Sequence, residues 1–214
     1  MSKLITIGIL EDNFSLRTSI QEFLIATSRF DIIFSEDAYF NIKHKKYGVD
    51  LEFIIIDIHL ADVNAIDVVD DIKVRFPSTQ VILITGDNDE SLLLKAIEKG
   101  GSCYIVKPII LKDLIKIIDT LQETGSYLAP ELLTTLMQQL VVRKKKNAVN
   151  DNTSLTDREA DILELVEMGC TYKEIASRLN ISYHTVNHHL RSIYIKFDVN
   201  SKVELITKRL LNNT

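Results

Sequence analysis

Residues 53–60 read FIIIDIHL, in which four apolar residues lead directly into the carboxylate of Asp57. A strand this apolar suits burial on both faces, as in a parallel sheet that helices cover on each side. Similar short runs lie at 4–10, 31–35, 81–85 and 103–106, and segments of helical character separate them. The alternation predicts an α/β, doubly wound domain of flavodoxin-like type, with five parallel strands in the order 2-1-3-4-5.

The composition is that of an ordinary globular protein, with 46% hydrophobic and 26% charged residues. No apolar stretch approaches the ~20 residues needed to cross a bilayer, and MSKLITIGIL at the start lacks a secretory cleavage pattern. Cys103 and Cys170 show neither metal-ligand nor redox spacing, so we expect free thiols in a reducing compartment. The expected location is therefore cytoplasmic, with no membrane partner.

Charge is distributed unevenly along the chain. The net charge is −7 over residues 1–125, +3 over 126–150 and −1 over 151–214. An acidic part, a basic connector and a nearly neutral part indicate two domains and a linker. The predicted segments are a first domain at 1–124, a partly helical linker at 125–150 and a second domain at 151–214.

The linker is predicted to combine a short helix with a polar tether. APELLTTLMQQL (129–140) places Pro130 in a first helical turn, whereas RKKKNAVNDNTS (143–154) has little apolar content. The RKKK run is expected to be a solvated charge run, and contact with DNA phosphates is the alternative.

The second domain is helical in pattern throughout. TDRE (156–159), TYKE (171–174) and SKVE (201–204) are capping boxes that start three helices, and Ser182 caps another. A tight turn at LNIS (179–182) joins the middle two helices. This pattern predicts an all-α, four-helix domain of the helix-turn-helix type.

Acidic residues gather where two neighbouring strands of the predicted sheet end. Glu11 and Asp12 follow the first strand, and Asp57 ends the third. Neighbouring strands lie ~4.8 Å apart, and two like charges ~4 Å apart repel by about 4 kcal/mol at an effective dielectric near 20. Such a cluster requires a cation or a protonated carboxylate, and an all-oxygen site with open water positions suits Mg²⁺ better than Ca²⁺.

Two further strand ends add complementary groups. Thr85 ends the fourth strand with a hydroxyl, and Lys107 ends the fifth with an ammonium. A phosphoryl group on Asp57 would need a metal for its charge, a hydroxyl donor and a cation.

These residues, Glu11-Asp12, Asp57, Thr85-Gly86 and Lys107-Pro108, resemble in order and spacing the signature of two-component response-regulator receiver domains. The resemblance implies that Asp57 accepts a phosphoryl group from a sensor histidine kinase. It also implies that Mg²⁺ is held by Glu11, Asp12, Asp57 and the main-chain carbonyl of His59. Lys107 would pair with the phosphate, and its peptide bond to Pro108 would be cis. Tyr104 would be a switch aromatic that turns inward when Thr85 bonds the phosphoryl oxygens.

The loop after Asp57 departs from the family pattern. Ala61 and Ala65 stand where the family often has proline and glycine. If the Ala65 position needs a positive φ, alanine costs roughly 1 kcal/mol there. The departure concerns the geometry of the 58–66 loop and leaves the acceptor assignment unchanged.

Residues 154–206 resemble the LuxR-type DNA-binding domain through LTDRE, the turn at Gly169, KEIA, LNIS and TV..H. With an apolar stripe facing the core, the opposite face of the third helix carries Asn187, His188 and Arg191, whose types suit base edges in the major groove. Asn187 replaces the lysine usual in the family. The candidate DNA-binding residues are Asn187, His188, Arg191, Lys196, Thr185 and Lys173. His189 matches a family histidine and is expected to pack, with base contact as the alternative.

The near-neutral second domain is weakly charged for a DNA binder. Dimerisation would compensate, and Val203, Ile206 and Leu210 on the last helix form a candidate apolar seam. Packing of these three residues on the other helices is an equal alternative.

Together the two resemblances indicate a response regulator of the NarL/FixJ class. The expected function is transcription control, in which the receiver masks the second domain until Asp57 is phosphorylated. The expected partners are a sensor histidine kinase, double-stranded DNA and a second copy of the chain. We expect that the chain is not an enzyme, except that the receiver assists its own aspartyl phosphorylation and dephosphorylation. The alternative is a phosphorylation-dependent interaction module whose helix-turn-helix binds a protein.

Overall fold

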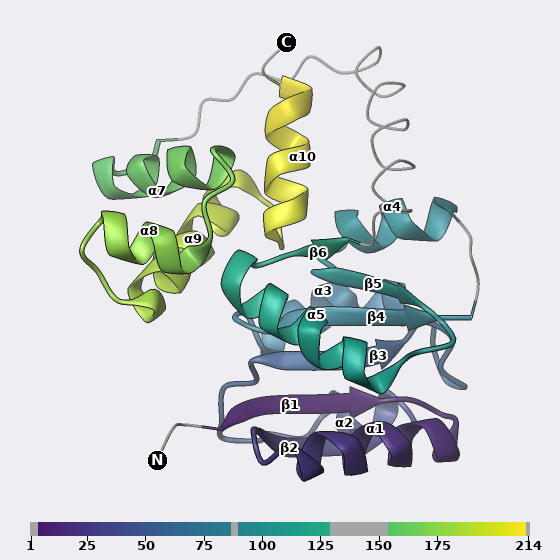
Figure 1. The fold of residues 1–214 in the computed structure, drawn as a ribbon. Coiled ribbons are helices and arrows are strands. Elements are labelled where there is room, and N and C mark those ends of the chain that lie inside the picture. The colour runs from purple at the N-terminus through teal and green to yellow at the C-terminus, as the bar shows by residue number, and fades with distance from the viewer. Residues whose placement is uncertain (1–3, 87–89, 129–153, 213–214) are drawn as a thin grey trace.

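The computed structural model describes residues 4–86, 90–128 and 154–212. The first part of the chain alternates strands and helices (Figure 1). Its elements are β1 (Ile5–Leu10), α1 (Phe14–Ala26), β2 (Phe30–Glu36), α2 (Phe40–Lys43), β3 (Phe53–Asp57), α3 (Ala65–Arg75), β4 (Gln80–Thr85), α4 (Glu90–Glu98), β5 (Cys103–Val106), α5 (Leu111–Thr124) and β6 (Tyr127–Leu128).

The strands form one parallel sheet in the order β2-β1-β3-β4-β5-β6. The predicted order of the first five strands is confirmed. The short β6 was not predicted, and it occupies residues that the sequence assigned to the linker. The expected helix at 129–140 and the basic run at 143–146 lie outside the described residues.

Each face of the sheet packs against its own helices, because successive side chains of a strand point to opposite faces. Ile55 joins a core with residues of α1 and α5, whereas Ile54 and Ile56 join a second core with residues of α2, α3 and α4. Burying one such isoleucine contributes about 1.5–3 kcal/mol. The apolar run before Asp57 thus holds the acceptor strand at the centre of the domain.

Helix starts are marked by side-chain caps. The Asn13 side chain accepts a hydrogen bond from Leu16 N at 3.0 Å and caps α1. The Asn64 side chain accepts from Ile66 N at 3.0 Å and caps α3, so Ala65 is the first residue of a helix. Ala65 is not among the described residues with positive φ, and the expected cost of alanine there does not arise.

The second part of the chain forms a helical domain with its own core. Its elements are α7 (Asp157–Glu167), α8 (Tyr172–Arg178), α9 (Tyr183–Phe197) and α10 (Lys202–Asn212). Capping boxes start α7 and α8 as predicted, and Ser182 caps α9. At the start of α10, Ser201 Oγ accepts from Glu204 N at 3.2 Å as the third predicted capping box requires, while the Glu204 side chain accepts from Asn200 N at 2.7 Å. Residues of all four helices share one buried cluster.

In the described ranges, none of the helices combines the length and apolar character needed to span a membrane.

Candidate functional site

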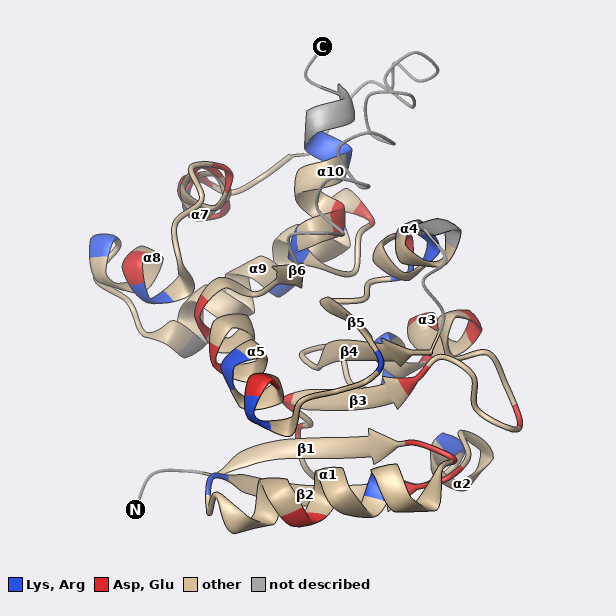
Figure 2. Cartoon of the chain, turned by 45° about the vertical axis from the view of Figure 1, so that its right-hand side comes forward, with Lys and Arg blue, Asp and Glu red and all other residues tan. Residues whose placement is uncertain are grey.

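Three carboxylates converge at the carboxyl ends of β1 and β3. Glu11 and Asp12 follow β1, and one ligand oxygen from each of Glu11, Asp12 and Asp57 lies within 4.8 Å of the others. Glu11 and Asp57 are buried, whereas Asp12 is exposed. Figure 2 shows acidic residues in the loop that leaves β1. The arrangement offers hard oxygen ligands with one side open to solvent, as a Mg²⁺ site requires.

Lys107 supplies the positive charge that this cluster needs. Its Nζ lies 2.6 Å from Asp57 Oδ2 and 3.0 Å from Glu11 Oε2. Burial raises the pKa of Glu11, and the nearby charge of Asp57 raises it further, while Lys107 opposes both. Burial works against the charge of Lys107, but hydrogen bonds to Asp57 and Glu11 outweigh it and raise its pKa. The peptide bond from Lys107 to Pro108 is cis, as expected.

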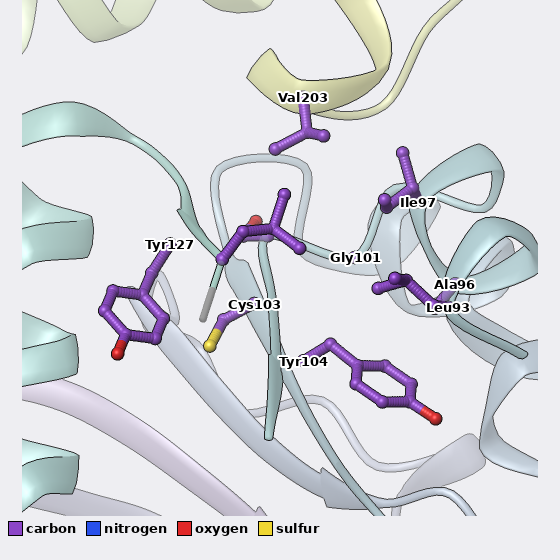
Figure 3. Close-up of a pocket in the computed structure, with 10 residues that line it drawn as sticks. Leu93, Ala96, Ile97, Gly101, Cys103, Tyr104, Tyr127 and Val203 are labelled. Carbon is purple, nitrogen blue, oxygen red and sulfur yellow. The ribbon is translucent and has the colours of Figure 1, made fainter. Parts of the chain in front are cut away.

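Thr85 and Tyr104 lie on the neighbouring strands β4 and β5. Thr85 is fully buried at the end of β4, where its carbonyl accepts a hydrogen bond from Lys107 N at 2.7 Å. Tyr104 is 3% exposed and packs into the core that includes Leu93 of α4 (Figure 3). Thr85 and Tyr104 are therefore both buried inside the domain.

The loop after Asp57 is ordered around the acceptor. His59 N donates to Asp57 Oδ1 at 3.3 Å, and His59 pairs with Asn64 in an isolated bridge. Ile58 N donates to Ile84 O at 2.7 Å, which ties this loop to β4. The His59 main chain is thus next to the acceptor carboxylate, while its side chain is exposed.

The predicted base-reading residues of α9 face the first domain. Asn187, His188 and Arg191 line a cavity with residues that begin β3 and β4. Arg191 Nη1 donates to Ser78 Oγ at 3.3 Å across the two domains. A duplex cannot occupy the space that the first domain fills here, so this arrangement is closed toward DNA.

The other candidate DNA-binding residues are engaged elsewhere. Lys173 Nζ lies 2.6 Å from Glu123 Oε1 of α5, which is an exposed ion pair between the domains. Lys196 Nζ lies 2.6 Å from Glu159 Oε2 inside its own domain. The Thr185 hydroxyl shares a hydrogen bond of 2.8 Å with Ser182 Oγ at the start of α9.

The Glu159–Lys196 pair has a large expected effect on stability. Burial would raise the pKa of Glu159, yet hydrogen bonds from Lys196, Ser192 and Thr156 lower it to about 2. A folded-state pKa below the usual 4.5 means that this stabilisation is present above pH 4.5 and is lost as the pH falls toward 2.

We therefore expect Glu159→Gln to lower the free energy of unfolding by about 3 kcal/mol at pH 7, because it leaves Lys196 without its charged partner. Urea unfolding followed by circular dichroism measures this loss, and the difference from the unmodified chain should shrink near pH 2. An equal midpoint at pH 7 would contradict the assignment. Glu164→Gln, on the exposed side of α7, is the control.

The sequence predicted that the receiver masks the second domain, but not which residues form the interface. The Tyr183 hydroxyl donates to Gln122 O at 2.7 Å, and Lys202 Nζ donates to Thr124 O at 2.8 Å. Both acceptors belong to the last turn of α5, whose carbonyls lack partners within the helix and carry the negative end of its dipole. Backbone carbonyls are the same in every residue type, so the sequence does not mark these two acceptors, which lie 61 and 78 positions before their donors.

The candidate dimer seam on α10 is divided between two cores. Val203 is buried in the core of the first domain, where it lines a cavity of about 10 Å³ with Leu93 and Ile97 of α4 (Figure 3). Ile206 packs against the core of the helical domain. The Leu210 side chain lies outside the described residues. In this closed arrangement Val203 and Ile206 pack on other elements of the chain, which was the alternative to a dimer seam.

Two family models match the chain. The model described as the response regulator receiver domain matches residues 7–119, and the model described as bacterial regulatory proteins of the luxR family matches residues 153–208. The receiver match alone covers more than half of the 214 residues. Each match falls on one of the two folded parts.

Similar proteins extend over nearly the whole chain. The chain is 24% identical to the transcriptional regulatory protein DegU of Brevibacillus brevis, over 97% of this chain and 94% of DegU. It is 24% identical to the nitrate/nitrite response regulator protein NarL of Escherichia coli strain K12, over 93% of this chain and 92% of NarL. The structure of RcsB from Salmonella enterica serovar Typhimurium, bound to promoter rprA with phosphomimetic BeF3−, has a TM-score of 0.55 at 21% identity, covering 94% of this chain and 96% of that chain. At this identity the last likeness concerns the fold.

Proposed function

The chain belongs to the two-component response regulators of the NarL/FixJ class, and from this premise we propose that phosphorylation of Asp57 controls its binding to DNA. The observation that carries the proposal is that Asn187, His188 and Arg191 line the cavity between the helical domain and the receiver. His188 and Arg191 stay exposed at its rim, where Arg191 bonds to Ser78 of the receiver. Residues 1–124 and the added strand β6 at Tyr127–Leu128 are then the receiver, the rest of 125–150 the linker and 151–214 the DNA-binding domain. Such a protein is a regulator and not a classical enzyme.

The acidic cluster is proposed to hold Mg²⁺ during phosphoryl transfer. The fit rests on two observations: the donors of Glu11, Asp12 and Asp57 are all oxygens within 4.8 Å, and Glu11 and Asp57 are buried like charges. The His59 main-chain carbonyl would complete the protein ligands. When bound, the ion offsets the negative charge that gathers as a phosphoryl group approaches Asp57.

Asp57 itself is proposed to be the nucleophile. One carboxylate oxygen attacks phosphorus of a phosphohistidine on the partner kinase, the phosphorus–nitrogen bond breaks, and the imidazole leaves with the bond electrons and takes up a proton. Lys107, now bonded to Asp57 and Glu11, would move its contact to the phosphoryl oxygens. The same geometry would let the receiver assist later hydrolysis of the acyl phosphate.

Phosphorylation is proposed to reach the interface through Thr85 and Tyr104. Thr85 would donate its hydroxyl to the phosphoryl oxygens. Tyr104 shares a core with Leu93 of α4 and with Val203 of α10. A ligand shifts an equilibrium only by its differential affinity for the two states. The phosphoryl group therefore needs to favour an arrangement of α4 and β5 in which the contact between α4 and Val203 of α10 is weaker.

Release of α10 would also free Val203 for a dimer seam with Ile206 and Leu210. A dimer would add a second set of DNA contacts to a domain whose net charge is only −1. This proposal links the weak charge of the domain to its need for a second copy.

DNA retention compared between states tests the proposed control. We expect the 148–214 fragment and the full chain treated with acetyl phosphate and Mg²⁺ to bind promoter DNA from the protein's gene neighbourhood. The untreated full chain should bind at least about tenfold more weakly, within the usual range of allosteric coupling. Fluorescence anisotropy measures all three affinities. Equal binding by every state would refute masking.

A protein-binding role for the helix-turn-helix is the second candidate function. It is favoured by the engagement of Lys173 and Lys196 in ion pairs, which leaves fewer free cations for phosphates. DNA binding by phosphate contacts weakens steeply with salt. A genome-wide pull-down that recovers no DNA, together with a partner affinity that does not change with salt, would favour this candidate.

A further inference from the structure

A cavity of about 260 Å³ lies between the two domains at the amino-terminal edge of the sheet. This edge is opposite the strand ends that carry Asp57. Starts of β3, β4 and β5 and the end of α5 form one side, and α8, α9 and the start of α10 form the other. The volume is close to that of small-molecule sites, which begin at about 300 Å³.

Two buried polar atoms in the lining lack partners among the described residues. Thr79 is 1% exposed, and its hydroxyl Oγ1 has no hydrogen-bond partner. Gln80 Nε2 donates to Leu121 O at 3.2 Å, whereas Gln80 Oε1 is buried without a donor. Both atoms are covered by protein and lie behind the cavity wall, so the polar groups open to a ligand are those of the other lining residues.

Positive charge in the lining is not matched by carboxylates at close range. Lys73 Nζ donates to Thr79 O and Lys202 Nζ donates to Thr124 O, each at 2.8 Å, so both bonds go to backbone carbonyls. Burial lowers the pKa of both lysines, that of Lys73 to about 8, although Glu204 partly offsets it there. The charged lining residues are Lys73, Arg191 and Lys202 against Asp50 and Glu52, which leaves one positive charge in excess. An anion would stabilise this lining.

The remaining lining suits a flat ring with polar edges. Tyr183 and Tyr194 contribute aromatic rings, whereas Tyr172 is 3% exposed and Lys202 Nζ lies 5.4 Å from the centroid of its ring. Asn187 contributes a side-chain amide, the group that pairs with an adenine edge in DNA. Arginine, present here as Arg191, can bind phosphate through bidentate hydrogen bonds. Residues suited to reading a nucleotide within DNA therefore surround a space of nearly ligand size.

We propose that this cavity binds a purine mononucleotide, with its phosphate toward Lys73, Lys202 and Arg191 and its base against the tyrosines and Asn187. The ligand contacts both domains, so it stabilises the closed arrangement and competes with DNA for α9. The effect on DNA rests on the proposed function, whereas binding itself needs only the closed arrangement.

Isothermal titration calorimetry of the full chain with AMP, without Mg²⁺, tests the site. We expect one AMP per chain, and adenosine or inorganic phosphate alone should bind at least about tenfold more weakly. Lys73→Met and Asn187→Ala, on opposite sides of the cavity, should each weaken AMP binding about tenfold. Lys46→Met, an exposed lysine outside the cavity, should bind AMP as the unmodified chain does.

Three results would overturn the proposal. The first is no binding at millimolar AMP, and the second is equal AMP binding by Lys73→Met, Asn187→Ala and the unmodified chain. The third is phosphate binding as tight as that of AMP, which would mean an anion site without nucleotide recognition. AMP binding that depends on Lys73 and Asn187, together with DNA binding that ignores phosphorylation, would refute the proposed function and leave the site standing.

Discussion

Replacing Asp57 with asparagine is expected to abolish phosphoryl incorporation entirely. The substitution removes the nucleophilic carboxylate and one of the three acidic groups that converge at the carboxyl ends of β1 and β3. An amide keeps the size of the side chain, and only its Oδ1 can still accept the hydrogen bond from His59 N. Folding should therefore be preserved while the chemistry is lost.

Phosphate-affinity electrophoresis after treatment with acetyl phosphate and Mg²⁺ measures the loss. The matched control is Asp67→Asn, an exposed carboxylate in the first turn of α3, which should be phosphorylated as the unmodified chain is. Undiminished incorporation in Asp57→Asn would show that the phosphoryl group is carried elsewhere, and the site assignment would be wrong. Circular dichroism of both variants verifies that the fold is retained.

Replacing Gly125 with alanine is expected to open the chain without phosphorylation. Gly125 has a φ of +77°, and a Cβ there would lie 1.9 Å from the Tyr172 hydroxyl of the other domain. Neither atom can yield, because Gly125 ends α5 and Tyr172 is buried in the helical core. We expect the affinity of the unphosphorylated chain for DNA to rise about tenfold or more, toward that of the phosphorylated chain.

The backbone strain of alanine at positive φ needs a separate control. Gly48 has a φ of +67°, and a Cβ there meets nothing within 4 Å, so Gly48→Ala adds the same strain without touching the other domain. Fluorescence anisotropy should show stronger DNA binding for Gly125→Ala alone. Equal behaviour of the two variants would mean that the contact at Tyr172 does not restrain the helical domain.

Much of the fold could be predicted because the relevant signals are local. The run before Asp57 predicted a strand buried on both faces, and its Ile54 and Ile55 do enter opposite cores. Thr156 and Thr171 predicted helix starts through capping boxes that the structure contains. Hydrophobic periodicity and helix caps involve residues that are close in sequence, so a single sequence is enough to recognise them.

The candidate phosphorylation site could also be predicted from the sequence, because parallel strands bring their carboxyl ends to one edge of the sheet. That rule alone places Glu11 beside Asp57 across 46 positions, and the structure joins both through Lys107. The loop after Asp57 was less accessible. The concern over Ala65 was misplaced, since Asn64 caps α3 and gives the chain a path with ordinary φ values.

The position of the helical domain could not be read from the sequence. Its contacts combine backbone carbonyls of α5 with side chains such as Tyr183 and Lys202, and carbonyls are the same in every residue type. The polar face of α9 predicted a nucleic-acid contact, but the same polar face is expected whether the helix is free or covered by the receiver. For the same reason the sequence left Val203 open between a dimer seam and packing on other helices, and in this structure it packs against α4.

Small-angle X-ray scattering by the full chain, before and after phosphorylation by acetyl phosphate and Mg²⁺, tests the central claim most directly. Release of Tyr183 from Gln122 and of Lys202 from Thr124 should separate the domains, so we expect the radius of gyration to increase on phosphorylation. An unchanged scattering curve from a sample that mass spectrometry shows to be fully phosphorylated would contradict the claim that phosphorylation opens the protein.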